Sequence, residues 1–151
     1  MIDVYFENLP VGHVIELGQH RVTREAIIEF ATEFDPQPHH LDEEAANASI
    51  LKGLSASGWH TCTIMMRMLC DGLVHRAASM GSPGIDEVRW MKPVRPDDLL
   101  TMRGVVKSAR VSKSKPDMGI VDIEWSLFNE REQVALMRAT GLYQVKNPEA
   151  A

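Results

Sequence analysis

The sequence SGWHTCTIMMRMLCDGLVHRAA, residues 57–78, determines how the rest of the chain must be arranged. Almost every position in it is apolar, and the clear exceptions are Arg67, Asp71, His75 and Arg76. A helix that is apolar over most of its circumference is buried, either inside a protein or in a membrane. The charges interrupt the apolar run well short of the ~18 residues that a membrane span requires. The stretch therefore predicts a central core helix, with Arg67, Asp71 and His75 forming one polar stripe.

The chain after this helix carries only strand patterns. In IVDIEWSLF, residues 120–128, apolar and polar residues alternate with a period of two, which is typical of a half-buried strand. The turn-forming sequence NERE follows, and then another strand pattern. The predicted strands cover residues 84–94, 99–111, 120–128 and 134–145.

The chain before the helix begins with one further strand pattern, residues 13–22, and continues as a helix. Thr23 is a candidate N-cap for that helix. Asp35 ends it, because a residue before proline, here Pro36, is pushed out of the helical region. A second, shorter helix is expected around residues 41–49. The positions expected to face inward on these two helices are Ile27, Phe30, Ala31, Phe34, Leu41, Ala45 and Ala48.

One early strand, a helical block and then consecutive strands joined by short turns indicate an α+β protein. A single long apolar helix needs a sheet that curves around it. We therefore predict a hot-dog fold, in which a curved antiparallel sheet wraps around a long central helix, as one domain over residues 1–151.

Length and composition limit the class of protein. A chain of 151 residues is long enough to build one core without disulfides or metals. The net charge of -5 argues against nucleic acid as a partner, since phosphate binding needs concentrated positive charge. The N-terminal residues do not read as a secretion signal. Cys62 and Cys70 lie eight positions apart on one helix, about 12 Å along its axis, so they are expected to be reduced thiols in a cytoplasmic protein.

The sequence EFDPQPHHLDEE, residues 33–44, is the strongest candidate for chemistry. A carboxylate and an imidazole acting together can move protons near neutral pH, and Asp35 lies close to His39 and His40. The two prolines between them restrict the backbone. An ordinary helix stop with solvated histidines is also compatible with this pattern. A metal site that includes Asp42 is less favoured, because the prolines make it hard for these side chains to converge.

The same residues resemble the MaoC-like dehydratases, which include the (R)-specific enoyl-CoA hydratases. The signature of that family is an Asp, four residues, a His, one residue and a second Asp, with a proline inside. Here it reads Asp35 to Asp42 and selects His40 rather than His39. LKGLSASGWHT, residues 51–61, resembles the glycine-rich entry to the family's central helix, and IDEVRWMKPVRPDD, residues 85–98, is similar to its strand-and-loop segment. The resemblance covers roughly residues 11–145.

The resemblance implies that Asp35 and His40 add or remove water across the α,β double bond of an acyl-CoA thioester. It implies no metal, and no cofactor other than the coenzyme A of the substrate. By its place in the motif, Gly53 is expected to donate its backbone N–H to the thioester oxyanion. Thr61 stands where some members carry a serine near the catalytic water. The chain departs from the pattern at Lys52, where many hydratases have a histidine, and at Asp97, where glycine is usual.

Further residues are candidates for binding the substrate. Ser57 and Gly58 are small enough to let an acyl chain lie close to the backbone, and Trp59 is placed to line the acyl pocket. Arg89 and Lys92 are basic residues placed to meet the phosphates of coenzyme A. For each of these residues, packing or ordinary surface exposure is the alternative explanation.

Two other functions remain open from the sequence. Hot-dog proteins also act as acyl-CoA thioesterases, although the central helix here offers only Asp71 as a carboxylate. A non-catalytic module that binds acyl-CoA or acyl-carrier thioesters is the third possibility. An open strand edge invites pairing, so we expect a homodimer or a dimer-based higher oligomer, with no nucleic acid and no membrane as partner.

Overall fold

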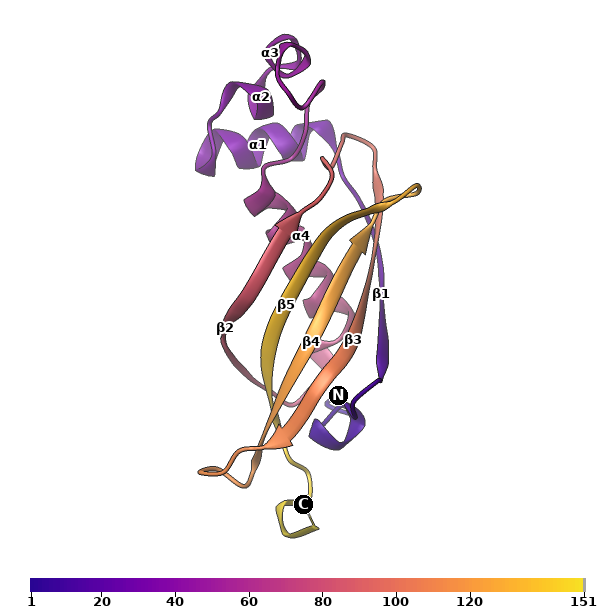
Figure 1. The fold of residues 1–151 in the computed structure, drawn as a ribbon, viewed down its shortest axis with the longest axis vertical. Coiled ribbons are helices and arrows are strands. Elements are labelled where there is room, and N and C mark those ends of the chain that lie inside the picture. Colours follow the sequence, from indigo (N-terminus) through magenta and orange to yellow (C-terminus); the bar gives the residue numbers. More distant parts are fainter. Residues whose placement is uncertain (151) are drawn as a thin grey trace.

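The computed structural model describes residues 1–150 and contains one five-stranded antiparallel sheet, shown in Figure 1. The order of the strands across the sheet is β1-β3-β4-β5-β2, so β1 and β2 are its two edges. The strands are β1 (Val14–Arg21), β2 (Ser79–Trp90), β3 (Leu99–Val111), β4 (Met118–Phe128) and β5 (Gln133–Gln144).

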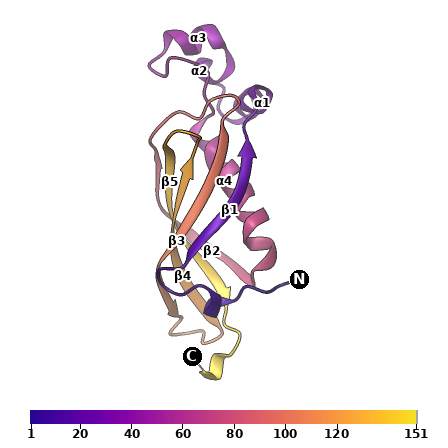
Figure 2. The same ribbon diagram turned by 90° about the vertical axis from the view of Figure 1, so that its right-hand side faces the viewer.

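A 15-residue helix, α4 (Gly58–Gly72), lies along one face of the sheet, while three shorter helices gather at one end (Figures 1 and 2). These are α1 (Arg24–Phe34), α2 (Pro38–Leu41) and α3 (Glu43–Ala48). Single 3-10 turns occur at η1 (Phe6–Asn8), η2 (Val74–Arg76) and η3 (Pro148–Ala150). Within residues 1–150, no helix is both long and apolar enough to cross a membrane.

The core lies between α4 and the facing side of the sheet. Ile64, Met65 and Met68 of α4 are buried, and β4 alternates buried and half-buried residues along its whole length. The largest side chain in this core is Trp125, which is 2% exposed. This is the predicted arrangement of a sheet around a central helix, and it follows from the two periodicities in the sequence.

Several predicted boundaries are confirmed. Strand β3 covers residues 99–111 as expected, and β1 and β4 each lie within two residues of their predicted ends. The Thr23 hydroxyl accepts a hydrogen bond from the Ala26 N–H at 3.1 Å, so it caps α1. Helix α1 ends at Phe34, directly before Asp35.

Other boundaries were wrong. The central helix stops at Gly72 rather than Ala78, because a glycine so near the end weakens the helix and η2 follows as a tighter turn. Strand β2 starts at Ser79 and includes Pro83, which an edge strand tolerates because a proline there removes no ladder hydrogen bond inside the sheet. In α3, Ala46 is buried and Ala48 is exposed, the reverse of the expectation for Ala48.

Candidate active site

The Asp-His motif lies where α1 ends and α2 begins. Asp35 is the residue that closes α1, and Pro38 is the first residue of α2. Consecutive residues on a helix point about 100° apart, so the two neighbouring histidines cannot share a direction. His40 is buried and His39 is half-buried, with the two rings edge to face at 4.2 Å. The helical turn therefore selects His40 as the inward-facing histidine.

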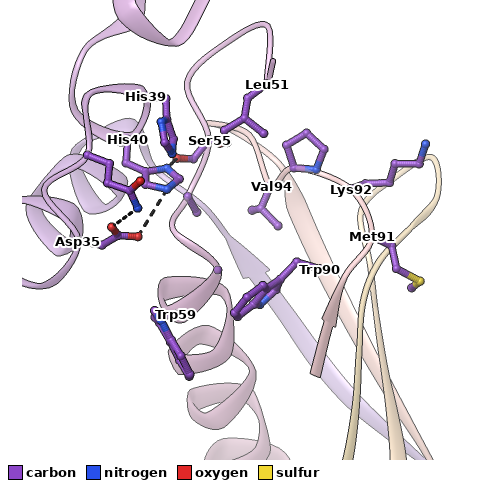
Figure 3. A pocket seen from close by; sticks show the side chains of 14 residues that line it. Asp35, His39, His40, Leu51, Ser55, Trp59, Trp90, Met91, Lys92 and Val94 are labelled. Atoms are coloured by element: carbon purple, nitrogen blue, oxygen red, sulfur yellow. Dashed lines mark hydrogen bonds and ion pairs between the residues drawn. The ribbon is translucent and has the colours of Figure 1, made fainter. Parts of the chain in front are cut away.

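The orientation of His40 is fixed by a backbone carbonyl. Its Nδ1 lies 2.7 Å from the carbonyl oxygen of Ser55, and a carbonyl oxygen can only accept, so Nδ1 carries the proton. In the neutral ring the other nitrogen, Nε2, then holds a free lone pair. Nε2 faces the Asp35 carboxylate, 3.5 Å from Oδ2, as Figure 3 shows. The pair presents a basic nitrogen and a carboxylate oxygen side by side.

The Asp35 carboxylate accepts two hydrogen bonds from other side chains. The Ser57 hydroxyl donates to Oδ2 at 2.7 Å, and the Gln37 side-chain amide donates to Oδ1 at 2.6 Å. The Ser57 hydroxyl and then the Gln37 amide hold the pKa of Asp35 below its ordinary value, although partial burial acts in the opposite direction. Asp35 is therefore ionised at neutral pH.

These groups line a cavity of about 470 Å³ between the α1–α2 junction and the end of β2. Trp59 and Trp90 form one wall, with their rings 5.6 Å apart and nearly perpendicular (Figure 3). The cavity thus combines one ionisable pair with a mainly apolar wall, which is the usual make-up of a small-molecule site. The lining residues are Asp35, Gln37, His39, His40, Leu51, Ser55, Ala56, Gly58, Trp59, Trp90, Met91, Lys92, Pro93 and Val94.

Gly58 places a backbone donor in this cavity. It is the first residue of α4, and among residues 1–150 no acceptor bonds its N–H. The first N–H groups of a helix carry partial positive charge, so they favour a negative oxygen. The Trp90 ring packs against Gly58, and a Cβ at this position would lie 2.5 Å from that ring. Only glycine leaves room both for the indole and for a ligand atom near the N–H.

Gly53 does not occupy the position expected of it. Its N–H donates to the carbonyl of Ala46 at 3.1 Å, so it is already engaged, and Gly53 lies outside the cavity. The adjacent Lys52 is exposed, with a φ of 56°, and lines a separate hollow beside Arg95. Gly53 is therefore not placed to donate into the cavity in this structure, whereas Gly58, five residues later, lines the cavity and has no bonded acceptor for its N–H among residues 1–150.

The other predicted site residues are divided between the cavity and its surroundings. Trp59 and Lys92 line the cavity, and both are exposed. Ser57 is fully buried and touches Asp35 instead of lining the cavity. Thr61 is buried one turn into α4, with its Oγ1 3.4 Å from the Ser57 carbonyl, and does not reach the cavity wall. Arg89 is exposed, pairs with Glu87 and lies outside the cavity.

Three groups that help to form the site were not predicted from the sequence. Gln37 lies inside the motif and its amide was visible in the sequence, but nothing in the spacing showed that it would turn back onto Asp35. The Ser55 carbonyl is a backbone group, so the residue type at this position does not predict its contact with His40. Trp90 is at the end of β2, and its pairing with Trp59 depends on the tertiary fold.

Comparisons with known proteins agree with this geometry. A family model described as "MaoC like domain" matches residues 7–125. The crystal structure of the MaoC-like dehydratase from Rhodospirillum rubrum is 42% identical, with a TM-score of 0.89 over 95% of this chain and 99% of that one. The (R)-hydratase from A. caviae is 20% identical, with a TM-score of 0.71 over 89% of this chain and 97% of that one, and shares the fold.

The uncharacterized protein YdeM of Bacillus subtilis is 28% identical over 126 residues, which is 83% of this chain and 88% of that protein. The family model covers well over half of the chain, and the strand and helix arrangement is shared with the solved hydratases. The chain belongs to the MaoC-like domain family, and its fold is the hot-dog fold.

Proposed function

We propose that the protein is a hydratase or dehydratase that adds or removes water across the α,β double bond of an enoyl thioester. The observation that carries this proposal is the His40 Nε2 lone pair turned onto the Asp35 carboxylate inside the cavity. The dehydratase from R. rubrum and the (R)-hydratase from A. caviae support it as relatives in sequence or fold.

In the hydration direction, a single water molecule donates two hydrogen bonds, one to His40 Nε2 and the other to Asp35 Oδ2. His40 removes a proton from this water as its oxygen attacks the β-carbon. The Asp35 carboxylate, held ionised by Ser57 and Gln37, stabilises the imidazolium that forms. The pair then returns a proton to the α-carbon, so both elements of water are added and His40 is neutral again. Dehydration is the reverse sequence.

The thioester carbonyl is placed at the start of α4. Attack on the β-carbon moves negative charge onto the carbonyl oxygen, and the Gly58 N–H is the free donor that faces the cavity. A fixed donor in a partly dry site stabilises such charge strongly, because it needs no reorganisation during the reaction. We therefore assign to Gly58 the oxyanion role that the sequence suggested for Gly53.

The substrate is an acyl thioester of coenzyme A or of an acyl carrier, with the acyl group against Trp59 and Trp90. Lys92, exposed beside the cavity, is the basic residue best placed to meet a substrate phosphate, whereas Arg89 faces away from the cavity lining. The reaction needs no cofactor beyond the thioester carrier. We further propose a homodimer that works in the cytoplasm, where Cys62 and Cys70 stay reduced.

The test is to mix the purified protein with crotonyl-CoA and to follow the loss of the conjugated-thioester absorbance. Asp35→Asn and His40→Ala are each expected to lower kcat by about 10² or more, because each removes a group that acts on the water. His39→Ala is the matched comparison, since this neighbouring histidine also lines the cavity but has no contact with Asp35. Its effect should be far smaller.

Three outcomes would contradict the proposal. Release of free thiol without hydration would favour a thioesterase, although Asp71, the only carboxylate of α4, is exposed and paired with Arg67. Tight binding of crotonyl-CoA without turnover would favour a binding module. Equal activity of the wild type and both catalytic-pair variants would exclude the mechanism itself.

A further inference from the structure

Residues 51–57, the later part of the segment between α3 and α4, determine where His40 can point. We call these residues the strap. It contains no helix or regular strand, and residues 54–57 are all buried. Its Ser55 carbonyl accepts the His40 Nδ1–H, which is the contact that fixes the tautomer and orientation of the ring. The geometry of the catalytic pair therefore depends on the position of a stretch of irregular backbone.

Arg95 binds the first part of the strap through three carbonyl oxygens. Its Nη1 donates to the carbonyl of Gly53 at 2.7 Å and to that of Leu54 at 3.3 Å, and its Nη2 donates to the carbonyl of Leu51. The carbonyl of Leu54 directly precedes that of Ser55 along the chain. Gly53 is packed against the guanidinium, since a Cβ there would lie 2.9 Å from Nη1. The strap is thus held by Arg95 at carbonyls other than the one that His40 uses.

Arg95 is itself fixed in place. Its backbone N–H donates to the buried carboxylate of Asp98 at 2.9 Å, and its carbonyl accepts from the Asp98 N–H. The preceding residue, Val94, accepts the N–H of Ala56 at 2.9 Å, which joins the same loop to the strap a second time. Within residues 1–150, the Arg95 guanidinium makes no ion pair. Its charge is directed at the strap carbonyls.

We propose that Arg95 is a positioning residue for His40, acting through the strap. The three carbonyl oxygens are spread over four residues, so they need several donors held in one plane. The guanidinium of arginine supplies such donors, whereas the ammonium of lysine is a single point of donation. Without the Arg95 guanidinium the strap is less restrained, so the Ser55 carbonyl moves. His40 is then no longer held with Nδ1 protonated and Nε2 toward Asp35. The inference rests on the proposed function only in that His40 is the base of the reaction.

Arg95→Ala and Arg95→Lys are compared with wild type, with Arg110→Ala as control. Arg110 is exposed on β3, near the end of that strand farther from α1 and the strap. With crotonyl-CoA, both Arg95 variants should lose about 10- to 100-fold in kcat while KM changes by less than about threefold, because misplacement of a catalytic group costs rate more than binding. Millimolar guanidinium should restore part of the kcat of Arg95→Ala and none of that of Arg110→Ala.

Nitrogen-15 NMR of the histidine side chains tests the same inference without activity. The His40 signals, assigned by their loss in His40→Gln, should show a protonated Nδ1 in wild type and exchange between both tautomers in the two Arg95 variants. If wild type does not hydrate crotonyl-CoA, the proposed function fails while this NMR comparison still decides the role of Arg95. The inference is overturned if folded Arg95→Lys gives an unchanged His40 signal. It is also overturned if the variants lose activity only because they unfold and guanidinium does not restore it.

Discussion

His60 is the residue whose environment is least favourable for a charge. It is buried in the first turn of α4 and stacks on Phe30 of α1, with ring centroids 4.8 Å apart. Its Nδ1 is buried and has no hydrogen-bond partner among residues 1–150. Burial, with a smaller repulsion from His20, lowers the pKa of His60 from 6.5 to about 4. The neutral ring is therefore part of the contact between α1 and α4.

This pKa makes the stability of the fold depend on pH. The unfolded chain takes up a proton at His60 near pH 6.5, whereas the folded chain resists it until about pH 4. The stabilising contribution is therefore complete above pH 6.5 and falls as the pH decreases toward 4. Between pH 7 and pH 5 we expect this residue to account for a loss of about 2 kcal/mol in the free energy of unfolding.

His60→Phe keeps an aromatic ring on Phe30 and removes the titrating group. Urea unfolding at one protein concentration should show a smaller loss of stability between pH 7 and pH 5 in this variant than in wild type. His75→Gln is the control, because it replaces an exposed histidine in η2, outside the contact between α1 and α4. The explanation is wrong if His60→Phe loses as much stability as wild type over this pH range.

At the level of the strands, the packing between β3 and β4 requires a glycine, Gly104, next to the indole of Trp125. Gly104 lies directly opposite Trp125 in the register, and a Cβ on it would lie 2.4 Å from the Trp125 ring. Trp125 is in the middle of the core, so its ring has no free volume into which to move. The glycine is thus required by packing, although glycine is normally unfavourable within a strand.

Gly104→Ala should therefore destabilise the protein by about 1–3 kcal/mol, as overpacking does in other cores. Gly18→Ala in β1 is the matched control, because no atom lies within 4 Å of the Cβ that it would add. That change should be neutral or slightly stabilising, since alanine restricts the unfolded chain. Urea unfolding of both variants measures the difference, and equal effects of the two would contradict the packing argument.

The elements differ in how far the sequence could predict them. β4 was evident because its alternation continues through nine residues, and α1 because Thr23 and Asp35 mark its two ends. Helix α2 was missed, since four residues are too few for any periodicity. The motif spacing selected His40, which the structure buries, but the sequence could not show which glycine N–H is free to donate. That choice between Gly53 and Gly58 depends on which N–H is already bonded.

At the level of the whole molecule, the two sheet edges are unequal. β2 is the more exposed edge strand, and it carries large apolar side chains in solvent, among them Ile85 at 53% and Trp90 at 48% exposure. An apolar edge strand of this length favours pairing with another strand. Within the proposed homodimer we therefore expect β2 to be part of the contact between the two copies.

Light scattering of the purified protein should give twice the 16.9 kDa mass of one chain. Ile85→Lys is expected to shift the mass toward that of the monomer, because it places a charge in the contact. Ile50→Lys is the control, since Ile50 is 93% exposed in the loop after α3 and is not part of β2. A wild-type mass equal to one chain would rule out the dimer.

The Ser57 hydroxyl connects the two parts of the proposed site through one atom. Its oxygen accepts the Trp59 N–H at 3.3 Å and so caps α4, while its hydrogen is bonded to Asp35. In the proposed reaction, the carboxylate that orients the attacking water and the helix start that binds the thioester oxygen are consequently joined through this one hydroxyl. In a conjugated enoyl thioester the β-carbon and the carbonyl oxygen belong to one planar unit, and only the change between its s-cis and s-trans forms alters their separation. Under the proposed function, loss of this one hydroxyl would therefore disturb both ends of the reacting enoyl unit at once.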